Sequence, residues 1–205
     1  MTAEPAAQPK LRKDAEINRC RIIAAAREEF RDRGVGATLD DVARRAGVGV
    51  GTVYRRFADK EELVDALFGD MMEILLAHLR TGLDATDAWI GLTECMEKVC
   101  EELACDRGLR EVMLGTGRGP ERQAQIRERL GPMIDELVGR AQREGKLRAD
   151  IVPADLTVLQ LVVAAVTEHT GRPELWRRYL VLFLDGVRAR PGAATPLPAM
   201  GASWR

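Results

Sequence analysis

Apolar residues stand three and four positions apart over most of this chain, which is the spacing of helices that bury one face. In the first third, the spacing predicts a helix over residues 15–33, two short helices on either side of Gly47, and a longer helix over residues 59–79. Two short helices cannot bury much against each other, so we expect the first helix to lie beneath them. The core of this three-helix unit is expected to contain Phe30, Leu39, Val42, Val53 and Phe57.

The sharpest pattern is the segment TLDDVARRAGVGVGTVYRRFADKEEL, residues 38–63. Thr38 with Asp41, and Asp59 with Glu62, have the spacing of capping boxes, in which two side chains satisfy the first amide groups of a helix reciprocally. Gly47 ends the helix between them after two turns. A short helix, a tight turn and a second short helix predict helix-turn-helix geometry.

The rest of the chain repeats the helical spacing. We expect a helix that Gly108 ends, a short piece over 109–114, a loop over 115–120, a long helix to about Gly145, and two helices that begin at Pro153 and Pro173. No segment has the alternation of a strand. The predicted fold is therefore all-α with about nine helices, arranged as a flexible basic arm (1–13), a three-helix helix-turn-helix domain (14–62), a larger helical domain (63–190) and a disordered tail (191–205).

Composition limits the class of protein. Hydrophobic residues make up 46% and charged residues 31% of the 205 residues, which fits a soluble helical protein. The net charge is −1, but residues 10–63 hold 13 basic and 10 acidic side chains, so any basic surface is local. No apolar run is long enough to span a membrane, and residues 1–8 lack the pattern of a secretory signal, so we expect a cytoplasmic protein.

Side chains that could carry catalysis or bind a metal are scattered along the chain. His78 and His169 stand alone, and Cys95, Cys100 and Cys105 are five positions apart, which rotates each by about 140° from the last on a helix. We therefore expect reduced thiols, no metal site, no cofactor and no catalytic residue. The protein is not expected to be an enzyme.

The segment from about Ile22 to Leu67 resembles the amino-terminal domain of the TetR (tetracycline-repressor-like) family of transcriptional regulators. The motifs that carry the resemblance follow the family's order: IIAAAREEF, a glycine, TLDDVARRAGV, GTVYRRF and DKEEL. The resemblance implies that the residues that hold DNA phosphates are Thr38, Tyr54, Arg55 and Lys60. It also implies that the residues that face base edges are Val50, Thr52 and Arg56.

Further residues of the two short helices complete the predicted DNA-contact surface. Arg44 and Arg45 end the first of them, and Gly51 lies in the first turn of the second; a merely solvated basic face is the alternative for the arginines. Gly49 and Val50 depart from the family, which usually has Ser or Thr and then a polar or basic residue there. Val50 offers only apolar contact to a base. We expect a double-stranded DNA operator whose sequence these residues do not specify.

The last two helices are apolar around most of their circumference, over residues 156–166 and 175–187. We expect each to pair with its symmetry mate in a homodimer, which paired recognition helices also require. The TetR resemblance implies the same interface. The residues expected there are Leu161, Ala165, Leu180 and Leu184.

The helices over residues 63–141 are expected to enclose a pocket for a small, largely apolar effector of unknown identity. Its expected lining is Met71, Leu75, Trp89, Met96, Met113, Met133 and Leu137. Thr93 or Cys95 is the expected polar neighbour. Methionines also fill irregular gaps in cores, so the same residues fit a solid core as well.

These features together predict a ligand-responsive regulator, most simply a repressor that binds a palindromic operator as a homodimer and leaves it when the effector binds. One alternative is a helix-turn-helix regulator that responds to oxidation of Cys95, Cys100 or Cys105. Another is a helical small-molecule-binding protein or enzyme that has no role in regulation. The sequence holds no constellation of nucleophile and base, which argues against an enzyme.

Overall fold

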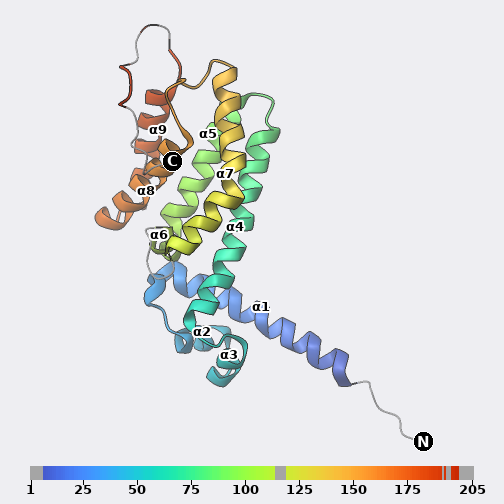
Figure 1. The fold of residues 1–205 in the computed structure, drawn as a ribbon. Helices are drawn as coiled ribbons and strands as arrows, with labels where there is room; N and C mark the ends of the chain where they lie inside the picture. The colour runs from blue at the N-terminus through green and yellow to red at the C-terminus, as the bar shows by residue number, and fades with distance from the viewer. Residues whose placement is uncertain (1–6, 114–118, 191, 193–194, 199–205) are drawn as a thin grey trace, which may run out of the picture. The chain divides into compact units, whose positions relative to one another are not determined.

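The computed structural model describes residues 7–113, 119–190, 192 and 195–198; within these ranges the side chains of residues 7–16, 35, 112–113, 119–120 and 173 are not described. Over the described residues the chain forms nine α-helices, two short 3₁₀ helices and no strand beyond one isolated bridge, so the all-α prediction is confirmed (Figure 1). The elements are α1 (Ala7–Arg33), η1 (Gly34–Gly36), α2 (Leu39–Ala46), α3 (Val50–Arg56), α4 (Lys60–Asp84), α5 (Ala88–Cys105), α6 (Arg107–Met113), α7 (Gly119–Arg143), α8 (Pro153–Thr170), η2 (Pro173–Leu175) and α9 (Trp176–Val187). None of the described helices has the length and apolar composition needed to cross a membrane.

The chain divides into two compact units, Met1–Met71 and Met72–Arg205. The boundary expected after residue 62 lies earlier than this division, because the first turns of α4 belong to the first unit. Phe68 is buried there, and the Asp70 carboxylate accepts a hydrogen bond from the Arg27 guanidinium of α1 at 2.8 Å. The capping signal at Asp59 marks the residue at which a helix begins. It does not mark the residue at which a compact unit ends, because one helix can belong to two units.

The first helix begins earlier than the sequence analysis expected. The backbone is helical from Ala7, so residues 7–13 of the expected flexible arm belong to α1, while residues 1–6 lie outside the described range. Pro9 falls in the first turn of the helix. Amide groups of a first turn have no intrahelical acceptor, so a proline there costs no hydrogen bond.

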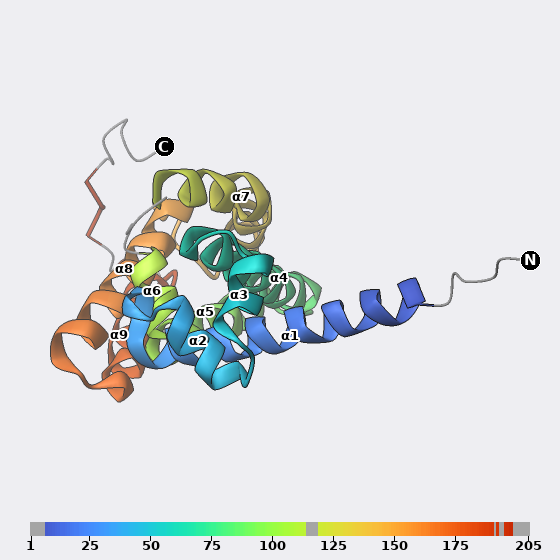
Figure 2. The ribbon, with the colours of Figure 1, turned by 90° about the horizontal axis from the view of Figure 1, so that it is seen from below.

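The first unit is built on the predicted core. In that unit α2 packs against α1, and α3 packs against α2 (Figure 2). The side chains expected in the core are all buried, namely Phe30, Leu39, Val42, Val53 and Phe57. Ile22 and Ala26, which follow the same spacing on α1, are fully buried too. Helical periodicity therefore predicts the interior of this unit correctly.

The second unit is organised around α5, which α7, α8 and α9 contact (Figure 1). The buried residues of α5 run along its whole length: Ala88, Gly91, Leu92, Cys95, Met96, Val99, Cys100, Leu103 and Ala104. Helix α4 approaches α5 closely where Gly82 meets Gly91. A Cβ atom added to Gly82 would lie 2.8 Å from the Gly91 carbonyl oxygen, so this crossing has no room for a larger side chain at that position.

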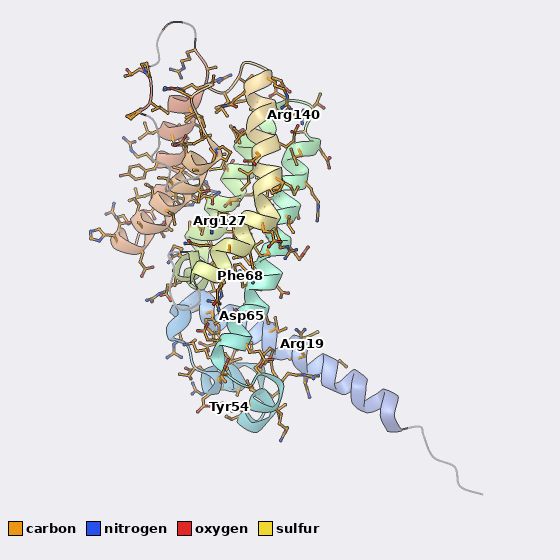
Figure 3. The ribbon with its side chains drawn as sticks, viewed as in Figure 1. Arg19, Tyr54, Asp65, Phe68, Arg127 and Arg140 are labelled. Atoms are coloured by element: carbon orange, nitrogen blue, oxygen red, sulfur yellow. The ribbon has the colours of Figure 1, made fainter. Side chains whose placement is uncertain are left out.

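Arg140 holds the end of α4 in the second unit. Arg140, near the end of α7 (Figure 3), donates through Nη1 to the Leu83 carbonyl at 2.6 Å and through Nη2 to the Thr86 carbonyl at 3.0 Å. These bonds supply donors to carbonyls at and after the end of α4, which the helix leaves unpaired. Helix α4 therefore continues to Asp84, beyond the end expected near residue 79.

The break between α5 and α6 is set by Asp106, whereas the sequence analysis expected Gly108 to end the helix. The Asp106 carboxylate accepts a hydrogen bond from the Leu109 amide at 2.9 Å, which is the bond that begins a new helix. Gly108 lies inside α6. The expected loop over residues 115–120 falls mostly outside the described residues, and α7 has begun by Gly119.

The carboxy-terminal segment also differs from expectation. Pro153 begins α8 as predicted, but Pro173 begins a 3₁₀ turn and α9 starts only at Trp176. Part of the tail expected to be disordered is held in place: Arg148 Nη2 donates to the Thr195 carbonyl at 2.7 Å, and the amide of residue 197 donates to a carboxylate at 3.1 Å. Most other residues of the tail lie outside the described range.

The four cysteines are unpaired thiols in two different environments. Cys20 and Cys105 are exposed, whereas Cys95 and Cys100 are buried on α5. Burial raises the pKa of Cys95 to about 11, and burial together with the neighbouring Cys95 raises the pKa of Cys100 to about 12. Because the thiolate is the reactive form, Cys95 and Cys100 are protected from oxidation near neutral pH.

We expect two of the four thiols, Cys20 and Cys105, to react with Ellman's reagent in the native protein at about pH 8, and all four after denaturation in guanidinium. In the unfolded chain the two buried thiols ionise near pH 9. Their raised folded-state pKa therefore predicts that the free energy of unfolding falls as the pH rises above 9. The Cys20→Ser, Cys105→Ser double variant is the control for the thiol titration and should show no reaction with Ellman's reagent in the native protein. Native reaction of all four thiols would contradict the burial.

Candidate nucleic-acid interface

The start of α2 is held by Thr38 and Asp41. The Asp41 amide donates to Thr38 Oγ1 at 3.2 Å, and the Thr38 amide and hydroxyl donate to the Asp41 carboxylate at 3.1 and 2.7 Å. The predicted capping box is therefore present. The hydrogen bonds from Thr38, together with the Arg33 guanidinium at 3.1 Å, hold the pKa of Asp41 well below its usual range. Asp41 is thus ionised at neutral pH and stabilises the positive end of the α2 dipole.

The turn between α2 and α3 is made by the backbone. Gly47 has φ of 66° and its amide donates to the Arg44 carbonyl at 3.3 Å; glycine takes this left-handed conformation at little cost. Gly49 caps α3 without any side-chain hydrogen bond, and its carbonyl accepts from the Thr52 amide at 2.7 Å. The amino-terminal end of α3 is therefore not covered by a capping side chain.

Helix α3 turns one side to the core and the rest to solvent. Val53 is fully buried, whereas Val50 is 41% exposed and Tyr54, labelled in Figure 3, is 52% exposed. The other exposed residues of α3 are Gly51, Arg55 and Arg56, and Thr52 is partly exposed. Arg55 Nη2 donates to Thr52 Oγ1 at 3.1 Å, so these two side chains lie together. This short helix therefore presents a phenol, a hydroxyl and guanidinium groups outside the core.

Residues on the neighbouring helices extend this surface. The Arg44 side chain is 74% exposed, with its guanidinium 3.1 Å from Asp41. Lys60, at the start of α4, has its Nζ 5.8 Å from the centre of the Phe30 ring. Thr38 is exposed although its hydroxyl donates to Asp41. The structure therefore gathers these predicted contact residues on elements that adjoin α3 in the first unit.

Arg45 is also exposed, but its guanidinium is paired with carboxylates of α1. Its guanidinium lies 3.0 Å from Glu29 and 3.1 Å from Asp32, both on α1, and the Glu29 side chain is only 9% exposed. Arg45 therefore ties α2 to α1, and its role as a DNA contact stays a prediction. Neighbours on a helix point about 100° apart, so Arg44 and Arg45 cannot share one face. The sequence does not say which of them meets α1.

The residues predicted to line an effector pocket occupy different surroundings. Those buried in the second unit are Leu75, Met96 and Leu137, and Met133 is partly buried there. Met71 is assigned to the first unit, and the side chain of Met113 lies outside the described residues. The Trp89 ring has the Arg188 guanidinium 5.3 Å from its centre. The expected polar neighbour Thr93 already donates its hydroxyl to the Ile90 carbonyl at 3.1 Å.

The residues predicted for a dimer interface are also divided. Leu180 is only 4% exposed in the single chain, so it belongs to the core of its own unit and not to an outer face. Leu161 and Leu184 are partly buried and Ala165 is exposed. The large apolar side chains that are exposed on α8 and α9 are Val162, Tyr179, Val181 and Leu182. The spacing could not point to these four, because it cannot separate the inner from the outer face of a helix that is apolar on both.

Comparison with known proteins identifies the two parts of the chain. A family model described as bacterial regulatory proteins of the tetR family matches residues 22–67, and a model for the C-terminal domain of SbtR-like transcriptional regulators matches residues 84–189. The HTH-type transcriptional regulator UidR of Escherichia coli K12 is 26% identical over 185 residues, which cover 87% of this chain and 93% of that protein. These relatives are regulators and not enzymes.

Solved structures agree with this grouping. A TetR transcription regulatory protein from Mycobacterium vanbaalenii is 32% identical, with a TM-score of 0.62 over 87% of this chain and 99% of that chain. The transcriptional regulator FadR of Bacillus subtilis, solved in complex with stearoyl-CoA, shares the fold at 21% identity, with a TM-score of 0.62 over 82% of this chain and 98% of that chain. The two matched segments and the 32% identity to a structure of nearly the same extent show that this chain belongs to the TetR family of transcriptional regulators.

Proposed function

We propose that this protein is a repressor that binds a palindromic operator as a homodimer and is released by a small, largely apolar effector. The observation that carries the proposal is the exposed side of α3, where Tyr54 and Arg55 stand outside while Val53 is fully buried. Groups that contact phosphate set the register of a protein on DNA, and side chains at the front of a recognition helix read base edges.

The proposed contacts follow from position on this surface. The residues proposed to hold phosphates are Thr38, Arg44, Tyr54, Arg55 and Lys60. The residues proposed to face base edges are Val50, Gly51, Thr52 and Arg56. Val50 and Gly51 offer no hydrogen-bonding side chain, so their discrimination rests on shape and on contact with apolar groups such as the thymine methyl.

The proposed dimer rests on the outer faces of α8 and α9. Val181 and Leu182 are each 58% exposed, and Val162 and Tyr179 add to the apolar surface of the same two helices. Exposed apolar surface of this kind marks an interaction site. A two-fold pairing through these helices would present two copies of α3 to half-sites about one helical turn of DNA apart.

The proposed release by an effector draws on the second unit and on similar proteins. The Bacillus subtilis FadR structure contains stearoyl-CoA, and NalD of Pseudomonas aeruginosa is described as a secondary repressor of a multidrug efflux pump. An effector that shifts the DNA-competent population from 99:1 to 1:99 needs about 5.5 kcal/mol of differential affinity. Burial of an apolar ligand against side chains such as Met96 and Leu137 can supply it. Helix α4 contributes residues to both units, which suits it to transmit the change.

The DNA contacts are tested with Arg55→Ala. Loss of one phosphate contact should weaken binding to every DNA sequence about tenfold and reduce the slope of log affinity against log salt by about one. The measurement is fluorescence anisotropy with labelled duplexes from the DNA flanking the protein's own reading frame. Arg172→Ala is the matched control, because Arg172 is an exposed arginine of the second unit. An unchanged affinity and salt slope in Arg55→Ala would contradict the proposed surface.

The dimer is tested with Leu182→Glu. A carboxylate buried unpaired in an apolar interface is costly, so the dimer dissociation constant should rise at least about 100-fold. Sedimentation velocity measures the association, and circular dichroism checks that the variant stays folded. Ile90→Glu is the matched control, because Ile90 is a 49% exposed apolar residue on α5. A Leu182→Glu variant that associates like the parent protein would remove this interface.

A further inference from the structure

Arg110 of α6 has one hydrogen-bond donor that nothing in the described structure satisfies. The residue is only 8% exposed. Its Nη1 donates to the carbonyls of Leu103 and Ala104 at 3.0 and 2.9 Å, and its Nη2 donates to Glu168 of α8 at 3.2 Å. The remaining donor, Nε, is buried and has no partner among the described residues. The bonds through the other two nitrogens hold the guanidinium in place at the end of α5.

Thr167 of α8 is a second buried group without a partner in this part of the chain. The residue is 4% exposed, and its Oγ1 makes no hydrogen bond with the described residues. Other helical threonines behave differently: Thr81, Thr93 and Thr170 each donate to a backbone carbonyl in the preceding turn. The Thr167 hydroxyl has not taken this ordinary partner.

The two unsatisfied groups belong to one junction. Glu168, which accepts a hydrogen bond from Arg110, is the residue next to Thr167 near the end of α8, and α8 contacts both α5 and α6. Buried polar groups without partners are rare, because leaving one unsatisfied is destabilising. Nε–H can only donate, and the Thr167 hydroxyl can also donate. What each group lacks among the described residues is therefore an acceptor.

The charges of the junction indicate what kind of acceptor fits. Arg107 lies 2.8 Å from Glu111 and 3.8 Å from Glu168, while Arg110 lies 3.2 Å from Glu168. The two cations are thus already matched by two carboxylates. An additional buried anion would compete with these carboxylates for the same two cations, which is costly. A neutral acceptor such as a carbonyl oxygen has no such cost.

The other buried side chains of these three helices near the junction are apolar. Those buried on the three helices near these groups are Leu103, Ala104, Leu109, Val163 and Ala164. An apolar molecule with one carbonyl group matches this combination, since its body would meet aliphatic surface and its oxygen would meet two donors.

We propose that Arg110 Nε and Thr167 Oγ1 bind the carbonyl oxygen of a neutral, largely apolar effector, such as a ketone or an ester. The inference rests on the proposed function and names the chemical class of its effector. It places the polar end of the effector at the junction of α5, α6 and α8, and not beside Thr93 or Cys95 as the sequence suggested. Because α8 also carries Val162 of the proposed dimer face, a ligand here acts directly on a helix that spaces the subunits.

The experiment observes the Arg110 Nε–H group by NMR in the full-length protein labelled with ¹⁵N. Its resonance is assigned by its loss in Arg110→Lys. The probes are 2-heptanone, a neutral ketone, and heptanoate, an anion of the same chain length. We expect 2-heptanone to shift the Arg110 resonance saturably and heptanoate to bind more weakly. Thr167→Val should weaken the ketone about fivefold, as the loss of one hydrogen bond predicts, while Thr167→Ser should restore binding.

Thr170→Val is the matched control on the same helix, because the Thr170 hydroxyl already donates to the Val166 carbonyl at 2.7 Å. It should leave the ketone affinity unchanged. The proposal is overturned if 2-heptanone produces no saturable shift, as it would if an ordered water alone satisfied the two donors. It is also overturned if Thr167→Val binds the ketone as tightly as the parent, or if heptanoate binds as well. Operator affinity is measured separately without probe, so a failure of this site is distinguishable from a failure of DNA binding.

Discussion

The DNA-facing part of this protein depends on the attachment of two short helices to α1. Helices α2 and α3 have eight and seven residues, too few to be stable alone in water. Burial of Val42, Val53 and Phe57 supplies the apolar part of the attachment. The polar part is the contact of Arg45 with Glu29 and Asp32 of α1. Without this support α3 would have no defined orientation. Its exposed side chains would then not form a fixed surface.

Because α2 is attached to α1, its two arginines have different surroundings. Arg45 is turned to carboxylates of α1, while Arg44 beside it is 74% exposed. Asp41 caps α2 and lies between the guanidinium groups of Arg33 and Arg44 at 3.1 Å from each. A net charge of −1 for the whole chain hides this arrangement. Local placement of cations, and not total charge, gives the family's DNA-binding unit its surface.

Features set by near neighbours in the sequence could be predicted. The capping box of Thr38 and Asp41, the left-handed Gly47 and the core positions of the first unit depend on spacings of three and four residues, and the structure contains them. The break at Asp106 was assigned to Gly108 because glycine is the commoner terminator, although the aspartate makes the capping bond. Each of these features depends on residues a few positions apart in the sequence.

Features set by contacts between distant segments could not be predicted. Arg44 and Arg45 are equivalent in the sequence until α1 is packed beside one of them. Leu180 and Leu182 are equally apolar, and only the packing of α9 makes the first 4% and the second 58% exposed. The unsatisfied groups of Arg110 and Thr167 are 57 positions apart in the chain and are related only through the fold. Hydrogen bonds between buried polar side chains of different helices do not produce a periodic pattern in the sequence.

We propose that two copies of the α3 surface bind DNA together. Hydroxyl-radical footprinting of the intact protein on the DNA flanking its own reading frame tests it most directly. Binding through two copies of α3 should protect stretches related by two-fold symmetry, with half-site centres separated by about 10 base pairs or a multiple of that spacing. Protection of a single asymmetric stretch, or of no stretch at protein concentrations at which the dimer is formed, would contradict it.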